Sequence, residues 1–167
     1  MADLPGLNYF FALAALSMAF VGFTSVVVVL YQSTGKELSA LHILLTRLFV
    51  ELGLMATGFA MLAPTLSICG FAPNTVWHFS SVIMLLALGS WLFYYPFRRK
   101  RAAPDESLPL RWWVMTGIGV AVLTYLATNA FALSVAPGPA PLALASVYVL
   151  SCATVAYLGT YSRFSGG

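Results

Sequence analysis

Residues 38 to 64 read LSALHILLTRLFVELGLMATGFAMLAP, an apolar run that contains only two charged side chains, Arg47 and Glu51. A helix needs about 20 predominantly apolar residues to cross the hydrocarbon core of a bilayer. The run exceeds that length, and Ser39 is a suitable amino-terminal capping residue. It therefore predicts a transmembrane helix.

Four other stretches of the chain meet the same criterion. They lie at about residues 8–31, 74–96, 110–135 and 141–161. Pro137, Pro139 and Pro141 interrupt the helical pattern before the last stretch, because proline lacks a backbone donor and clashes with the preceding turn. The sequence thus predicts an all-α integral membrane protein, a single transmembrane domain of residues 1–167 built as a five-helix bundle.

The composition excludes most other classes of protein. Of the 167 residues, 60% are hydrophobic and 8% are charged, whereas about a quarter of the residues in soluble domains are charged. A soluble enzyme and a nucleic-acid-binding module are both disfavoured. Cys69 and Cys152 are far apart and form no CxxC pair, so we expect neither a metal site nor a cofactor.

The orientation follows from the distribution of Lys and Arg, which favour cytoplasmic loops. The hydrophilic segment 97–109 contains a basic run. The seven basic residues that lie in the loops or near the helix ends all fall on the same side of the membrane as this segment: Lys36, Arg98, Arg99, Lys100, Arg101, Arg111 and Arg163. The sequence predicts an outside amino terminus, a cytoplasmic carboxyl terminus and a location in a bacterial inner membrane. Arg98, Arg99, Lys100 and Arg101 are expected to contact anionic lipid head groups.

Arg47 and Glu51 are the most unusual pair in the chain. They are four residues apart and so share one helical face, and the length of the run places Glu51 near the bilayer midplane. Charged side chains there are unfavourable and often functional. Two interpretations remain open: a site for ion or proton permeation, and a buried salt bridge that fixes helix packing.

Other polar side chains extend this set of candidates. Thr46 precedes Arg47, and Thr124, Thr128 and Asn129 lie near the outer end of the fourth helix. They either line an aqueous path, or hydrogen-bond between helices or back to the carbonyls of their own helix. His42 is a candidate pH sensor because histidine titrates near neutrality. Stripes of small residues predict close helix packing, within the chain or between copies; they include Ala12, Ala15, Ala19 and Gly22, and Gly117 and Ala121.

Three functions are compatible with these features. The first is an oligomeric ion or proton channel that uses the intramembrane Arg–Glu pair. The second is a structural or accessory subunit of a larger membrane complex. The third and least favoured is an intramembrane enzyme for lipophilic substrates, since no HExxH or GxSxG motif is present. The expected partners are the lipid bilayer and either further copies or other membrane subunits.

Overall fold

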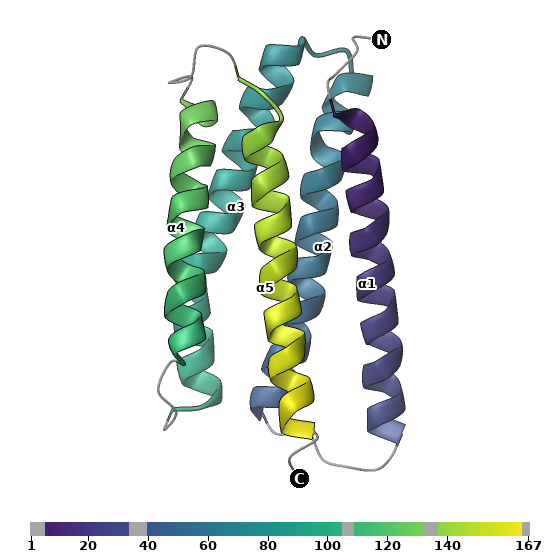
Figure 1. Cartoon of the computed structure of the whole chain (residues 1–167), viewed down its shortest axis with the longest axis vertical. Helices are drawn as coiled ribbons and strands as arrows, with labels where there is room; N and C mark the ends of the chain where they lie inside the picture. The colour runs from purple at the N-terminus through teal and green to yellow at the C-terminus, as the bar shows by residue number, and fades with distance from the viewer. Residues whose placement is uncertain (1–5, 34–39, 105–108, 132–136, 165–167) are drawn as a thin grey trace.

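The computed structural model describes residues 6–33, 40–104, 109–131 and 137–164. These residues form five helices and no strand, which confirms the all-helical prediction (Figure 1). The helices are α1 (Leu7–Ser33), α2 (Ala40–Ile68), α3 (Pro73–Ala102), α4 (Leu110–Ala130) and α5 (Ala140–Phe164). They run alternately up and down the long axis, so the two termini lie at opposite ends of the bundle.

Four segments of these helices are long and apolar enough to cross a membrane: Ile43–Ile68, Pro73–Ala102, Leu110–Ala130 and Ala140–Leu158. In α1, the corresponding apolar stretch with described side chains is Leu7–Phe23, which is shorter. The helical content and hydropathy are those of an integral membrane protein.

Three helix boundaries differ from the prediction: α4 ends at Ala130, before the expected residue 135, and two other helices extend further than expected. The second helix was expected to end at Pro64 and the third at Pro96, but α2 continues to Ile68 and α3 to Ala102. A proline removes one hydrogen bond from a helix, which membrane helices tolerate when neighbouring groups compensate. The expected loop 97–109 therefore begins later, and its basic run forms the last turns of α3, where cations interact favourably with the helix dipole.

The end of α2 has a sequence-encoded stop. Gly70 adopts a positive φ of 85°, a backbone conformation that glycine reaches without strain. The Gly70 N–H donates to the Ser67 carbonyl at 3.0 Å, and the Phe71 N–H donates to the Leu66 carbonyl at 3.4 Å. This pair of bonds is a Schellman motif, and it turns the chain towards α3.

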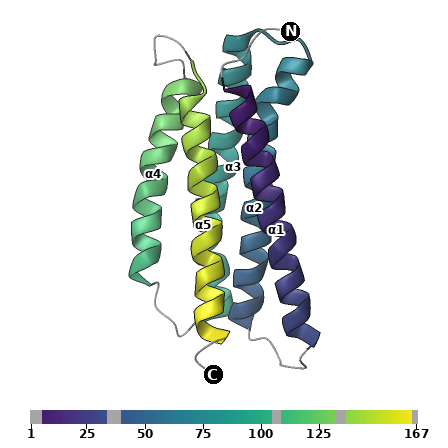
Figure 2. The ribbon, with the colours of Figure 1, turned by 45° about the vertical axis from the view of Figure 1, so that its right-hand side comes forward.

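The bundle is organised around α2. This helix packs against α5, α1 and α3, while α4 packs mainly against α3 and also against α5 (Figures 1 and 2). Phe49, Leu52 and Met84 are among the fully buried side chains. At Gly53, α2 approaches α1 so closely that a Cβ atom there would overlap Val21 of α1.

The small-residue stripe of α1 faces away from the rest of the chain. Its members Ala12, Ala15, Ala19 and Gly22 are all exposed. Gly117 and Ala121 of α4 are exposed as well. Within the chain, α1 instead buries a face made of larger side chains together with Ala14 and Ser17: Phe10, Leu13, Ala14, Ser17 and Val21. Close packing through these two stripes would therefore require another molecule.

Candidate functional site

Arg47, Glu51 and Arg98 form one ionic cluster that joins α2 to α3. Arg98 donates from Nη1 to Glu51 Oε2 at 2.6 Å and from Nη2 to Glu51 Oε1 at 3.1 Å. Arg47 donates from Nε to Glu51 Oε1 at 2.8 Å. A bidentate arginine fixes the carboxylate in plane and orientation as well as in distance, so the cluster sets the register of the two helices.

The cluster is located towards the basic end of the bundle. Glu51 lies 11 residues after the start of α2 and 17 residues before its end, which corresponds to about 17 Å and about 26 Å along the helix axis. Its partner Arg98 is four residues from the end of α3. The sequence predicted that Glu51 lies near the midplane and that Arg98 contacts the lipid head groups. The structure instead brings the two side chains into contact.

The three side chains differ in exposure. Arg47 is 72% exposed, whereas Glu51 and Arg98 are each 33% exposed. Arg47 lies near the start of an exposed stripe of α2 that continues with Leu54 and Gly58. The guanidinium of Arg47 therefore points away from the packed interior, and the carboxylate of Glu51 lies between it and α3.

A shallow groove runs along the outer surface of α2 and α3 beside the cluster. Its lining includes Met55 of α2 and Ser90, Trp91, Tyr94 and Arg98 of α3. The Ser90 hydroxyl donates to the Ala87 carbonyl of its own helix at 2.9 Å. The groove is thus apolar along most of its length and has a cation at one end.

Two of the three threonine candidates, Thr124 and Thr128, lie on a different helix from the cluster. The hydroxyl of Thr124 donates to the Val120 carbonyl at 2.9 Å, and that of Thr128 donates to the Tyr125 carbonyl at 2.7 Å. Both belong to α4, which has no extensive packing against α2. Thr46 is half-buried in α2. The two α4 hydroxyls therefore donate to carbonyls of their own helix, and among the described residues neither donates to another helix.

Asn129 occupies a different place, at the other end of the bundle. It is 2% exposed, and its side-chain amide donates to the Ser81 hydroxyl at 3.1 Å and to the Gly138 carbonyl at 2.9 Å. Its Oδ1 accepts from the Gly138 N–H at 3.2 Å. Asn129 therefore connects α4, α3 and the segment before α5, and does not face the ionic cluster.

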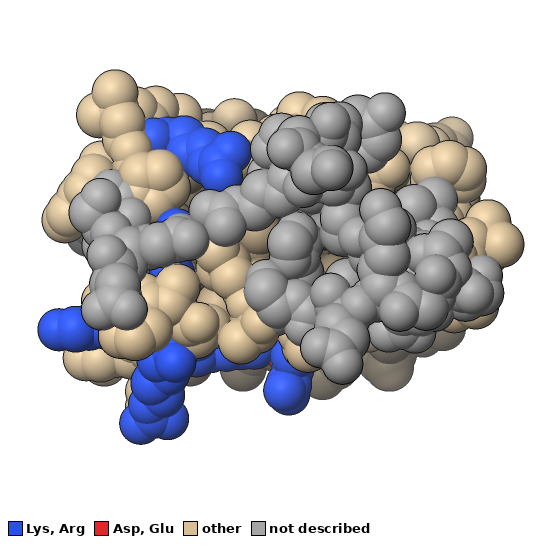
Figure 3. Space-filling model, turned by 90° about the horizontal axis from the view of Figure 1, so that it is seen from below, with Lys and Arg blue, Asp and Glu red and all other residues tan. Residues whose placement is uncertain are grey.

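The remaining basic residues lie near the opposite end from Asn129. Figure 3 looks onto this end and shows Lys and Arg side chains on its described surface. Lys100, Arg101 and Arg111 are exposed, whereas Arg99 is buried and 5% exposed. The four basic residues expected at the lipid head groups thus divide into two exposed cations, one cation paired with Glu51 and one inside the bundle.

The side chain of His42 lies outside the described residues, so its expected pH response stays a prediction. Among the residues that the structure describes, no three of His, Cys, Asp and Glu come together as a metal site would require. Glu51 is the one acidic residue whose side chain is described.

Sequence reasoning missed that Arg98 belongs to the site. One signal was available: Glu51 and Arg98 both fall within the apolar helices or at their ends, and a carboxylate in such surroundings needs more than one donor. Nothing in the sequence identified Ser90 and Tyr94 as neighbours of the cluster.

No protein-family model, curated protein or solved structure matches the chain. The function must therefore be argued from the chain itself.

Proposed function

We propose that the protein is a small accessory subunit of a membrane complex, and that it docks a partner helix against the outward face of α2 and α3. The observation that carries this proposal is the position of Arg47, a guanidinium that is 72% exposed within the apolar segment Ile43–Ile68. A charged side chain in such a segment that points away from its own bundle is stabilised by a partner or by the interface.

The charge of the cluster identifies the chemistry of the partner. Two guanidinium groups share the single carboxylate of Glu51, which leaves a surplus of one positive charge. A carboxylate on the partner helix would neutralise this surplus charge. Pairing of that carboxylate with a desolvated guanidinium gives specificity for the partner. No second carboxylate is found among the described side chains of this chain, and we propose that a partner helix supplies it.

The shape of the same face supports close approach of a helix. Gly58 is exposed, with open space where a side chain would stand, and it lies on the α2 surface next to the groove residue Met55. Small residues let the backbones of membrane helices come together and so increase van der Waals contact. Tyr94, exposed on α3, adds a large side chain with a polar end to the proposed interface.

We further propose that all five helices cross a bacterial inner membrane, with the amino terminus outside. The 27 residues of α1 correspond to about 40 Å of helix, enough to span the bilayer. The alternating helix directions bring the basic end of α3, the start of α4 and the end of α5 to one side, as the excess of positive charge in cytoplasmic segments requires.

A channel formed by several copies is the competing proposal, and it has less support. Both carboxylate oxygens of Glu51 are occupied by guanidinium donors, so a permeating cation would have to displace an arginine. Conduction would also have to pass between copies, because Glu51 and the α4 threonines do not form one continuous polar path in a single chain.

The size of the complex extracted from the native membrane tests the proposal. Wild type, solubilised in a mild detergent, should elute as a complex larger than one chain, with a partner that contributes an acidic transmembrane helix. Arg47→Gln should release the free chain, whereas Arg101→Gln, which removes an exposed cation elsewhere, should leave the complex intact. A monomeric wild type, a complex of identical copies, or lipid as the sole companion would overturn the proposal.

A further inference from the structure

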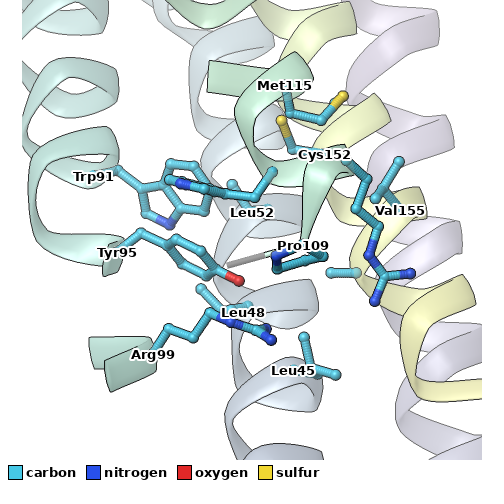
Figure 4. A pocket seen from close by; sticks show the side chains of 13 residues that line it. Leu45, Leu48, Leu52, Trp91, Tyr95, Arg99, Pro109, Met115, Cys152 and Val155 are labelled. Carbon is cyan, nitrogen blue, oxygen red and sulfur yellow. The ribbon is translucent and has the colours of Figure 1, made fainter. Parts of the chain in front are cut away.

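The groove between α2 and α3 has a fixed aromatic floor. Trp91 and Tyr95 of α3 line it, and the same two rings line a cavity of about 50 Å³ inside the bundle (Figure 4). The two rings are stacked with their centroids 5.4 Å apart, and Tyr95 packs against Trp112 of α4 at a centroid distance of 4.0 Å. Close-packed aromatic side chains keep their positions, so the floor does not rise to fill the groove.

The groove has room for a side chain of another molecule. Its volume is about 320 Å³, roughly ten times the volume that one water molecule occupies in the liquid. Met55 of α2 and Ala87, Ser90 and Tyr94 of α3 form its sides, and Ser90 and Tyr94 are exposed. An empty groove would leave these side chains without van der Waals partners on one side. In a bilayer the groove is therefore filled, either by an acyl chain or by protein.

The groove lies at a fixed distance from the ionic cluster. Arg98 lines one end of it. Ser90 comes eight residues before Arg98 on α3, and Met55 comes eight residues after Arg47 on α2. Eight residues of helix correspond to about 12 Å. A partner helix that places a carboxylate at Arg47 and runs along the bundle therefore passes the middle of the groove about two turns later, with the same face turned inwards.

The depth of the cluster favours a helix over a lipid as the occupant. Arg47 lies seven residues after the start of α2, about 10 Å along the helix axis. Lipid phosphates lie in the head-group region, outside the hydrocarbon core, whereas a transmembrane helix can carry a carboxylate at any depth. One helix also supplies both groups from a single rigid element, the anion for Arg47 and the apolar side chain for the groove.

We propose that the groove receives a large apolar side chain of the partner helix, about two turns along from the carboxylate that pairs with Arg47. This inference rests on the accessory function proposed above and adds a second contact to it. Two features on one helical face then define the partner. They are an acidic residue near the basic end, and a leucine, methionine or aromatic residue about seven or eight positions farther towards the opposite end. Two contacts at a fixed spacing select the partner and set its register.

The test fills the groove and measures the size of the complex extracted from the native membrane in a mild detergent. Ser90→Phe places a ring in the groove and should lower the ratio of complexed to free chain at least about tenfold, because the partner side chain then has no room. Ser151→Phe is the matched control. Ser151 is also an exposed serine that donates to its own helix, to the Val147 carbonyl at 2.8 Å, but it lies on α5. This control should change the ratio less than about twofold.

A second pair of variants opens the groove instead of filling it. Tyr94→Ala removes one side of the groove and should lower the same ratio about threefold or more, because the partner side chain loses its contacts there. Tyr125→Ala truncates an exposed tyrosine on α4 and should leave the ratio within about twofold of wild type. If Ser90→Phe does not fold, this second pair decides between the proposal and its failure.

The outcomes separate this inference from the accessory function. Release by Arg47→Gln together with intact complexes of Ser90→Phe and Tyr94→Ala would overturn the groove contact and leave the accessory function standing. A monomeric wild type would overturn both. Loss of a co-purified lipid from Ser90→Phe, with the protein complex intact, would assign the groove to an acyl chain and overturn the inference. Equal release by Ser90→Phe and Ser151→Phe would also overturn it, because the effect would then not depend on the groove.

Discussion

Replacing Glu51 with glutamine removes the carboxylate charge and nearly preserves its shape, and it leaves Arg47 and Arg98 facing each other without an anion. Exposed ion pairs contribute roughly 0.2–1 kcal/mol, and loss of one partner of a fully buried pair costs roughly 3–5 kcal/mol. Glu51 and Arg98 are 33% exposed, so the cost lies between the value for an exposed pair and the value for a fully buried pair. We expect Glu51→Gln to lower the free energy of unfolding by about 1–2 kcal/mol.

The geometry also predicts how this energy divides between the two arginines. Arg98 makes two hydrogen bonds to Glu51, whereas Arg47 makes one and is 72% exposed. A double-mutant cycle isolates each pair. The coupling of Glu51 with Arg98 should be about 1 kcal/mol or more, and that with Arg47 below about 0.5 kcal/mol.

The assay is thermal or denaturant unfolding of the purified chain in one detergent, with Glu51→Gln, Arg98→Gln, Arg47→Gln and the two double variants. For a chain of this length, 1 kcal/mol corresponds to roughly 2–4 °C in Tm. Arg101→Gln serves as the control for loss of a cation. A coupling to Arg47 that equals or exceeds the coupling to Arg98 would refute the reasoning, as would no coupling to either.

Three other outcomes follow from the packing. Gly53→Ala should lower the free energy of unfolding by about 1–3 kcal/mol, because its new methyl group overlaps α1. Gly58→Ala has open space around the new methyl group and should change the free energy of unfolding by less than about 0.5 kcal/mol. Unfolding measurements on the two variants test this difference. Asn129→Leu should cost about 1–3 kcal/mol by leaving the loop before α5 without its hydrogen bonds, and equal stability of this variant and Thr128→Val would contradict that. In liposomes, the wild-type chain should conduct neither protons nor ions above the background of empty vesicles. A flux that Glu51→Gln abolishes would favour the channel over the accessory subunit.

The helical class could be predicted because it depends on local sequence. Long apolar runs must satisfy their backbone hydrogen bonds internally in a bilayer, and a helix does so within one segment. The helix ends were less predictable at Pro64 and Pro96. Both helices were expected to end at these prolines, but in a membrane helix a proline removes one hydrogen bond and leaves the remainder of the helix intact.

The inward faces could not be predicted for a related reason. In α1, apolar residues surround the whole helix, so no amphipathic pattern distinguishes the side that packs from the side that faces lipid. The stripe Ala12, Ala15, Ala19 and Gly22 predicted close packing within the chain or between copies, and all four residues are exposed in the single chain. The larger side chains of Phe10 and Leu13 fill the interface between α1 and the rest of the bundle.

Two of the three members of the ionic cluster could be paired from the sequence. Arg47 and Glu51 are four residues apart, and helix geometry alone brings them together. Arg98 is 47 residues from Glu51, and its contact depends on the register of α3 against α2. The same holds for Asn129 and Ser81, which are 48 residues apart. A single sequence does not indicate which distant residues pair in this way.

The most direct test of the accessory role is photocross-linking in the native membrane from the outward face of α2. A photoreactive amino acid replaces Leu54, which is exposed on the same stripe as Arg47. In a control variant the same amino acid replaces Leu144, which is exposed on α5. The account predicts that Leu54 yields one adduct, with a transmembrane helix of another protein that carries an acidic residue, and that Arg47→Gln removes this adduct. It also predicts that Leu144 yields no such adduct. Equal adducts from both positions, adducts with lipid only, or an adduct that survives Arg47→Gln would contradict it.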